Sequence, residues 1–336
     1  MINFPKTQNL IESMVTERVV PGVNYAFLKD DQVFKSTLGF ASIYPKVTQL
    51  SPFAIYDMAS CTKVLATTAV LMLLYEKKKL NFKEPLQKFV PEFKDKRVKL
   101  YHLLTHTSGI RGWIPNRDQL SGHDLMRAIV NLPVTDEFEH VVRYADTNFV
   151  LLGLVIERIF NKPVQEVAQD LIFSPSGLKN TTFNPNAIDC VPTELINDHV
   201  LKGIVHDPKA RQLKSRCGSA GLFSNIDDLI KMGQGYAGID SSVLPLSQAT
   251  IEELYKVRTK APLQERAWGW NLVFDPYEKY PIIYHTGFTG TLIIFDRKKK
   301  SGLILLTNRV HPSQHNQIFL TMRSRIINSF LVENKY

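Results

Sequence analysis

Cysteine is scarce in this sequence, and long apolar runs are missing from it. The 336 residues include three cysteines, Cys61, Cys190 and Cys217, whose odd number and irregular spacing argue against a disulfide framework and for a reducing compartment. No apolar run reaches the roughly 18 residues that a membrane span needs. The N-terminus lacks the charged, apolar and small-residue regions of a signal peptide. We therefore expect a cytoplasmic protein without a membrane span.

Patterns typical of nucleic-acid and metal binding are also lacking. The formal charge of +9 comes from 41 basic and 32 acidic residues spread along the chain, without a basic stripe that carries interleaved aromatic residues. His102 and His106 are four residues apart, but no glutamate follows the first histidine as in metalloproteases. His206 and Asp207 give still less support for a metal site. We expect no metal, cofactor or nucleic-acid partner, and we expect these histidines to stabilise turns.

The order of apolar patterns predicts an α+β fold. Helical periodicity covers residues 5 to 18 and 313 to 334, and residues 22 to 41 predict a hairpin. Four more strands are predicted near the end, over residues 268–275, 281–285, 291–296 and 302–307. Short links between strands favour an antiparallel sheet flanked by the terminal helices. We predict a sheet domain of residues 1–75 and 205–336, with a mostly helical domain of residues 76–204 inserted in it.

Ser60 and Lys63 are the most informative residues of the chain. They precede the apolar run 64–74, which predicts a core helix because apolar residues lie on all its faces. Residues at i and i+3 share one helical face, so the Lys63 amine can reach the Ser60 hydroxyl and activate it as a nucleophile. The ordinary alternative is a capping serine followed by a surface lysine. Cys61 lies on another face, and we expect it to serve packing.

Two later clusters support the catalytic interpretation. Tyr144-Ala145-Asp146 lies about eighty residues on, and His285-Thr286-Gly287 follows an apolar strand near the end. Taken alone, Tyr144 would be a core tyrosine and His285 a structural histidine. Gly287 would let a ligand approach the backbone of an edge strand closely.

With these clusters, the chain resembles the serine β-lactamase and penicillin-binding-protein superfamily, in the branch that holds class C β-lactamases, family VIII carboxylesterases and D-aminopeptidases. Segments 101–109 and 219–224 are also similar to structural signatures of that family. The resemblance covers nearly the whole length. It implies a β-lactamase/transpeptidase-like fold with the active site in the cleft between the two domains.

The resemblance also implies roles for the site residues. Ser60 would be the acyl-accepting nucleophile, and Lys63 and Tyr144 would share the work of general base and general acid. Their pKa values are coupled, so which of the two is the base stays open. The backbone N–H groups of Ser60 and Phe288 would form the oxyanion hole. The residues expected to bind substrate are Asp146, His285, Thr286, Gly287 and Phe288.

Asp146 and His285 depart from the pattern of penicillin-recognising members, which carry asparagine and lysine there. A carboxylate can only accept hydrogen bonds, and near Lys63 it would raise the lysine pKa and shift the base role toward Tyr144. The alternatives for Asp146 are contact with a cationic group of the substrate and a solvent-facing position at a helix start. His285 tilts the expected substrate away from penicillins.

We predict a serine hydrolase that forms an acyl-enzyme with a small ester, amide or peptide and has esterase or D-amino-acid peptidase character. The first alternative is a true β-lactamase or DD-carboxypeptidase. The second, from another class, is a non-catalytic binding protein or sensor of cell-wall fragments. The residues do not specify the natural substrate or the oligomeric state.

Overall fold

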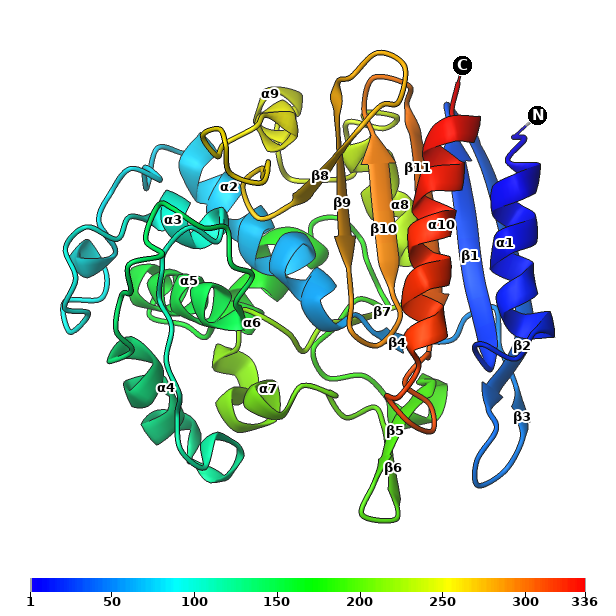
Figure 1. Ribbon diagram of the computed structural model, residues 1–336, viewed down its shortest axis with the longest axis horizontal. Helices are drawn as coiled ribbons and strands as arrows, with labels where there is room; N and C mark the ends of the chain where they lie inside the picture. Colours follow the sequence, from blue (N-terminus) through cyan, green and yellow to red (C-terminus); the bar gives the residue numbers. More distant parts are fainter. Residues whose placement is uncertain (1, 336) are drawn as a thin grey trace.

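The protein is built on a seven-stranded antiparallel sheet in the order β3-β2-β1-β11-β10-β9-β8. The computed structural model describes residues 2–335. The strands of this sheet are β1 (Gly22–Lys29), β2 (Gln32–Ser42), β3 (Thr48–Gln49), β8 (Asn271–Phe274), β9 (Pro281–Thr286), β10 (Leu292–Asp296) and β11 (Ser301–Thr307). Because β1 pairs with β11, the two ends of the chain complete one sheet, as Figure 1 shows. The predicted hairpin and the four late strands are confirmed.

The terminal helices α1 (Pro5–Thr16) and α10 (Gln317–Glu333) lie side by side on one face of the sheet (Figure 1). Ile11 and Phe319 are among the apolar residues that pack there with the strands. The helix predicted from residue 313 begins only at Gln317, because the Asn316 side chain accepts a hydrogen bond from the Phe319 N–H and caps it. The α+β prediction is confirmed.

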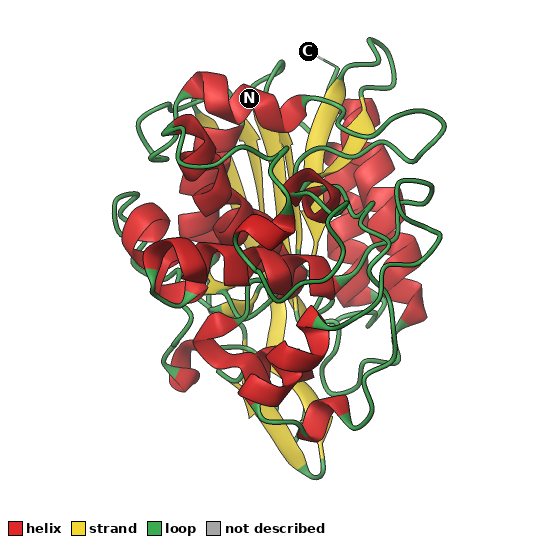
Figure 2. Ribbon diagram, turned by 90° about the vertical axis from the view of Figure 1, so that its left-hand side faces the viewer, coloured by secondary structure: helices red, strands yellow, loops and turns green. Residues whose placement is uncertain are grey.

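Helices and short strands make up the sequence between β3 and β8. They are α2 (Ala69–Glu76), α3 (Leu100–Leu104), α4 (Gly122–Val130), α5 (Asp146–Phe160), α6 (Val164–Ala168), α7 (Pro208–Leu213), α8 (Ile226–Tyr236), α9 (Gln248–Glu252), β4 (Tyr56–Asp57), β5 (Pro192–Ile196), β6 (His199–Lys202) and β7 (Phe223–Ser224). Figure 2, seen from their side, shows many of these helices in front of the strands, with the β5–β6 hairpin projecting below. The division at residues 76 and 204 stays a prediction.

The segment that carries Ser60 crosses the centre of the molecule. It winds as a 3₁₀ turn at Ala59–Cys61, a π-helix at Lys63–Thr68 and then α2, rather than as the regular α-helix predicted. Ser60 and Lys63 still point the same way, because Lys63 Nζ lies 2.9 Å from Ser60 Oγ. Ala59–Glu76 is long and apolar enough for a membrane span, but 83% of it is buried inside the protein, as expected of a core helix.

Candidate active site

The turn that presents Ser60 is held in a strained conformation. Ala59 has a φ of 44°, which is uncommon for a residue with a β-carbon. Its N–H donates to Asp57 Oδ1 at 2.8 Å, and its carbonyl accepts from Thr62 Oγ1 at 2.6 Å. Thr289 Oγ1 donates to the Asp57 carbonyl at 2.7 Å and so ties the turn to the segment after β9. Such strain persists where surrounding contacts determine the backbone, as they do here.

Lys63 is fully buried, and its ammonium group has three acceptors. The Nζ atom lies 2.9 Å from Ser60 Oγ, 2.9 Å from the Ser219 carbonyl oxygen and 2.8 Å from Asp146 Oδ1. An ammonium group has three N–H donors, so these contacts satisfy it completely. The predicted reach of Lys63 to Ser60 is therefore present, and the geometry is that of a protonated lysine.

Opposite charges keep Lys63 protonated and Asp146 ionised. Burial by itself lowers the pKa of Lys63, but the Asp146 carboxylate and then Tyr144 outweigh it and raise that pKa. Burial by itself raises the pKa of Asp146, but Lys63 and then Lys209 hold it far below its usual range. Lys209 Nζ lies 2.9 Å from Asp146 Oδ2, so both carboxylate oxygens are occupied. Asp146, the first residue of α5, is thus neither a solvent-facing residue nor a free acceptor for a substrate cation.

Tyr144 lies beside Lys63 on the loop before α5. Its ring centroid is 5.2 Å from Lys63 Nζ, and 46% of the residue is exposed, so it is not a core tyrosine. The His106 ring packs against it at 4.7 Å. His106 Nδ1 accepts from the Ala145 N–H at 3.3 Å and from Asn148 Nδ2 at 3.0 Å. His106 therefore stabilises the turn that carries Tyr144, which is the structural role expected of it.

His285 lies on β9 next to the site and is buried. Nδ1 donates to the Thr286 carbonyl at 3.1 Å, which leaves Nε2 as an acceptor, and Nε2 has no hydrogen-bond partner within residues 2–335. Burial, and after it the positive charges of Lys63 and Arg266, lowers the pKa of His285 well below its usual value. His285 is therefore neutral and is only partly satisfied by the protein.

These side chains surround a cavity of about 310 Å³. Its lining residues are Ser60, Tyr144, Asn271, His285, Thr286, Gly287, Phe288, Arg309, Leu320 and Arg323. The structure thus brings together Ser60, Tyr144 and the 285–288 segment, with Lys63 and Asp146 behind them. All predicted site residues belong to one place in the fold.

Two arginines of this cavity, Arg309 and Arg323, were not among the predicted site residues. Arg309 Nε donates to the Phe288 carbonyl at 2.7 Å, and Arg323 Nη1 donates to the Gly287 carbonyl at 3.3 Å. Burial lowers the pKa of both guanidinium groups but leaves them charged at neutral pH. Arg323 and Lys209 carry no sequence signal because only the fold brings α10 and α7 to the site.

The other two histidines considered as metal ligands pair instead with glutamate side chains. His102 Nε2 lies 2.8 Å from Glu139 Oε1, and His206 Nε2 lies 2.9 Å from Glu194 Oε2. Within residues 2–335, no group of three or more histidine, cysteine or acidic side chains is arranged to hold a metal ion. Burial raises the pKa of the Cys61 thiol to about 12, which suits packing rather than nucleophilic attack.

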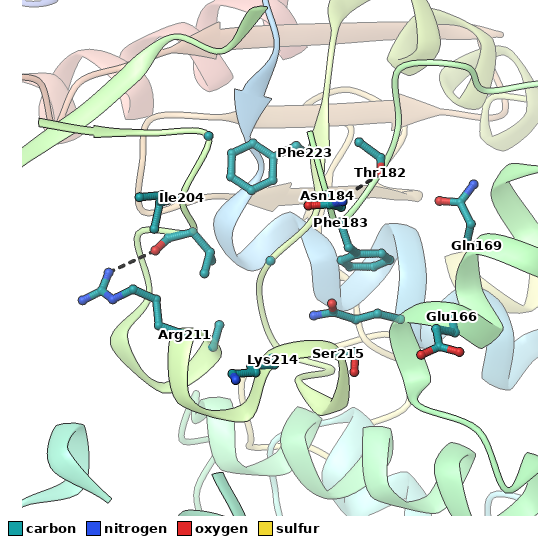
Figure 3. A pocket seen from close by; sticks show the side chains of 15 residues that line it. Glu166, Gln169, Thr182, Phe183, Asn184, Ile204, Arg211, Lys214, Ser215 and Phe223 are labelled. Carbon is teal, nitrogen blue, oxygen red and sulfur yellow. Dashed lines mark hydrogen bonds between the residues drawn. The ribbon is translucent and has the colours of Figure 1, made fainter. Parts of the chain in front are cut away.

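A second hollow of about 560 Å³ lies apart from this site. Figure 3 shows the Phe183 and Phe223 rings in its wall, with Arg211 and Lys214 from the region of α7 below them. None of the predicted site residues lines it. The chemistry therefore belongs to the smaller cavity around Ser60.

Comparison with known proteins agrees with this geometry. The family model described as Beta-lactamase matches residues 7–321. An N-acetylmuramyl-L-alanine amidase of Bacillus subtilis (strain 168) is 24% identical over 360 residues, which cover 89% of this chain and 80% of the relative. A putative D-alanyl-D-alanine carboxypeptidase of Salmonella agona (strain SL483) is 26% identical over 354 residues, covering 88% and 80%.

Solved structures share the fold. A class C beta-lactamase from Rhodobacter sphaeroides superposes with a TM-score of 0.78 at 16% identity, covering 97% of this chain and 98% of that one. At this identity the likeness establishes the fold, and it confirms the predicted β-lactamase/transpeptidase-like architecture.

Proposed function

The chain belongs to the Beta-lactamase family and is a serine hydrolase, and we propose that Ser60 takes up the acyl group of a small ester or amide and passes it to water. The contact between Lys63 Nζ and Ser60 Oγ at 2.9 Å is the observation that carries this proposal. Tyr144 on the rim of the same cavity supplies the second proton-transferring group.

The reaction has two halves. Ser60 Oγ attacks the carbonyl carbon, and its proton passes to the coupled Lys63 and Tyr144 pair. The bond to the leaving alcohol or amine then breaks, and the leaving group takes a proton from Tyr144, which is open to the cavity. Water hydrolyses the acyl-enzyme by the reverse proton route. The backbone N–H groups of Ser60 and Phe288 are proposed to stabilise the oxyanion in both halves.

Tyr144 is the better candidate for the base. All three Lys63 N–H donors have acceptors, one of which is Ser60 Oγ, so in this state lysine gives a hydrogen bond to the nucleophile rather than receiving one. His285 is neutral and lines the same cavity as Ser60.

Peptidase action on a substrate with a free carboxylate is the second candidate. Arg309 and Arg323 line the cavity of Ser60, and guanidinium groups are well suited to carboxylates. The Salmonella relative, named a putative D-alanyl-D-alanine carboxypeptidase, supports the same class. Ester or amide hydrolysis stays the first proposal because it needs only the residues around Ser60. A true β-lactamase and a non-catalytic binding protein remain the alternatives.

The test is intact-protein mass after exposure to a fluorophosphonate, with Ser60→Ala as control. Hydrolysis of p-nitrophenyl acetate and butyrate, D-alanine p-nitroanilide, a D-alanyl-D-alanine peptide and benzylpenicillin is measured in parallel. We expect one adduct on the natural protein, none on Ser60→Ala, and turnover of the esters or the amide above penicillin. A folded protein without adduct or turnover would favour the binding-protein alternative, and efficient penicillin turnover would favour the β-lactamase.

A further inference from the structure

Lys209, near the start of α7, contacts the Asp146 carboxylate at the oxygen that Lys63 does not contact. Its Nζ atom lies 2.9 Å from Asp146 Oδ2 and 3.1 Å from Asp207 Oδ2. Only 15% of its side chain is exposed. The four charges form an alternating line, Lys63, Asp146, Lys209 and Asp207, whose sum is zero. Asp207 is fixed in turn because its Oδ1 accepts from the Ala210 N–H at 2.8 Å and caps α7.

We propose that Lys209 is a positioning residue of the active site, which holds the outer oxygen of Asp146 and offsets the charge that this carboxylate directs at Lys63. An inference of this kind rests on the proposed acyl transfer to Ser60. An asparagine at position 146 would need no such partner, because an amide is neutral. A carboxylate there attracts the ammonium group of Lys63 and favours its protonated form. A second cation on the other carboxylate oxygen weakens this effect, because it offsets part of the negative charge.

The other groups around Lys63 do not supply the same counter-charge. Tyr144 faces it from the loop before α5, while His106 and the β9 residue His285 are kept neutral by burial. Cys61 is likewise neutral, since burial raises the pKa of its thiol. Arg266, before β8, is a buried cation that lies toward Tyr144 and His106 rather than toward the carboxylate. Lys209 is the cation that touches Asp146 on the side away from Lys63.

Two single variants should shift the pH–rate profile in opposite directions. The active state has lost one proton from the coupled Lys63 and Tyr144 pair, so its apparent pKa sets the ascending limb of the pH–rate profile. Lys209→Met removes a positive charge and moves this limb up by about one pH unit, which makes labelling about tenfold slower at a pH below it. Asp146→Asn removes a negative charge and moves the limb down. In the double variant the two shifts largely cancel.

The experiment measures the rate of fluorophosphonate labelling between pH 5.5 and 9.5 by intact mass, on full-length protein whose folding is checked by circular dichroism. Lys209→Arg keeps the charge and is expected to keep the limb in place. Lys214 lies on the exposed turn that follows α7 and does not belong to the line of four charges. Lys214→Met removes the same charge from the protein and is therefore the matched control for net charge. If Lys209→Met does not fold, the same upward shift is read between Asp146→Asn and the double variant.

The outcomes separate this inference from the proposed function. A natural protein that is not labelled at Ser60 overturns both. Labelling of the natural protein with a limb that Lys209→Met leaves unmoved, or moves no more than Lys214→Met does, overturns the role of Lys209 alone. Opposite shifts of the two single variants with near-cancellation in the double variant support it. A merely structural role of Lys209 would not give shifts of opposite sign in Lys209→Met and Asp146→Asn.

Discussion

The Asp146→Asn variant should lose stability in a way that depends on pH. It leaves the ammonium group of Lys63, which is fully buried, without a carboxylate at 2.8 Å. Leaving a buried charge without its partner costs about 3–5 kcal/mol. The protein can instead fold with Lys63 neutral, at a cost of about 1.36 kcal/mol for each pH unit below about 10.4, or about 4.6 kcal/mol at pH 7. Both routes predict a loss of about 3–5 kcal/mol at neutral pH.

The sign of the pH dependence distinguishes the two proteins. In the natural protein the pKa of Lys63 is raised, so its contribution to stability is complete below the unfolded pKa and is lost only as the pH rises through the folded value. In Asp146→Asn the pKa of Lys63 falls below its unfolded value, so the variant gains stability as the pH rises toward about 10.4. The gap between the proteins should shrink from about 3–5 kcal/mol at pH 7 to about 1–2 kcal/mol at pH 9.5.

On the acid side the gap should also shrink, for a different reason. The pKa of Asp146 is held far below its usual range, so its contribution is present above the unfolded pKa and is lost as the pH falls through the folded value. The assay is urea unfolding followed by tryptophan fluorescence at several pH values. Asp170→Asn, in an exposed ion pair with Lys162, is the control and should change stability by less than about 1 kcal/mol throughout. A gap that stays constant from pH 7 to 9.5 would contradict this prediction.

Three further predictions concern the same site. Tyr144→Phe should slow fluorophosphonate labelling by about 10²–10⁴-fold with little change in melting temperature, because it removes a proton-transferring group that is half exposed. The three cysteines are buried, so Ellman's reagent at pH 8 should find no fast thiol in the folded protein and three after denaturation; rapid labelling of Cys61 would contradict its role in packing. Gly287→Ala should lower both the melting temperature and the labelling rate, because an added β-carbon would lie 2.7 Å from the Met58 carbonyl and press on the turn before Ser60, and an unchanged labelling rate would show that the turn can yield.

The sequence was sufficient to predict the parts of the fold that follow from local pattern. The hairpin of β1 and β2 and the strands β8 to β11 carry alternating or continuous apolar residues, and the structure contains them close to the predicted bounds. The winding around Ser60 was not predictable, because Ala59 adopts its positive φ with its N–H bound to Asp57, which Thr289, after β9, holds in turn. The cytoplasmic location stays a prediction, since no feature of the fold bears on it.

The candidate site was predictable where residues come in motifs and not where they come singly. Ser60, Lys63, Tyr144 and His285 stand in short ordered clusters, and the structure brings these clusters together. Lys209 stands in a stretch with several other basic residues, and nothing in the spacing distinguishes it from them. Its role in the site depends on the packing of α7 near the N-terminus of α5, which places Lys209 Nζ 2.9 Å from Asp146 Oδ2.

The charges around Ser60 explain how a paired lysine can still support acyl transfer. Lys63 and Asp146 offset each other, and so do Lys209 and Asp207, so this line contributes little net field. The other positive charges near the site are the guanidinium groups of Arg266, Arg309 and Arg323, all largely buried. Fixed positive charge in a partly dry cavity stabilises an oxyanion on the substrate, the anion that the proposed reaction forms. Acyl transfer at such a site does not require Lys63 to lose its proton first, because the positive field stabilises the anionic transition state while Lys63 stays paired with Asp146.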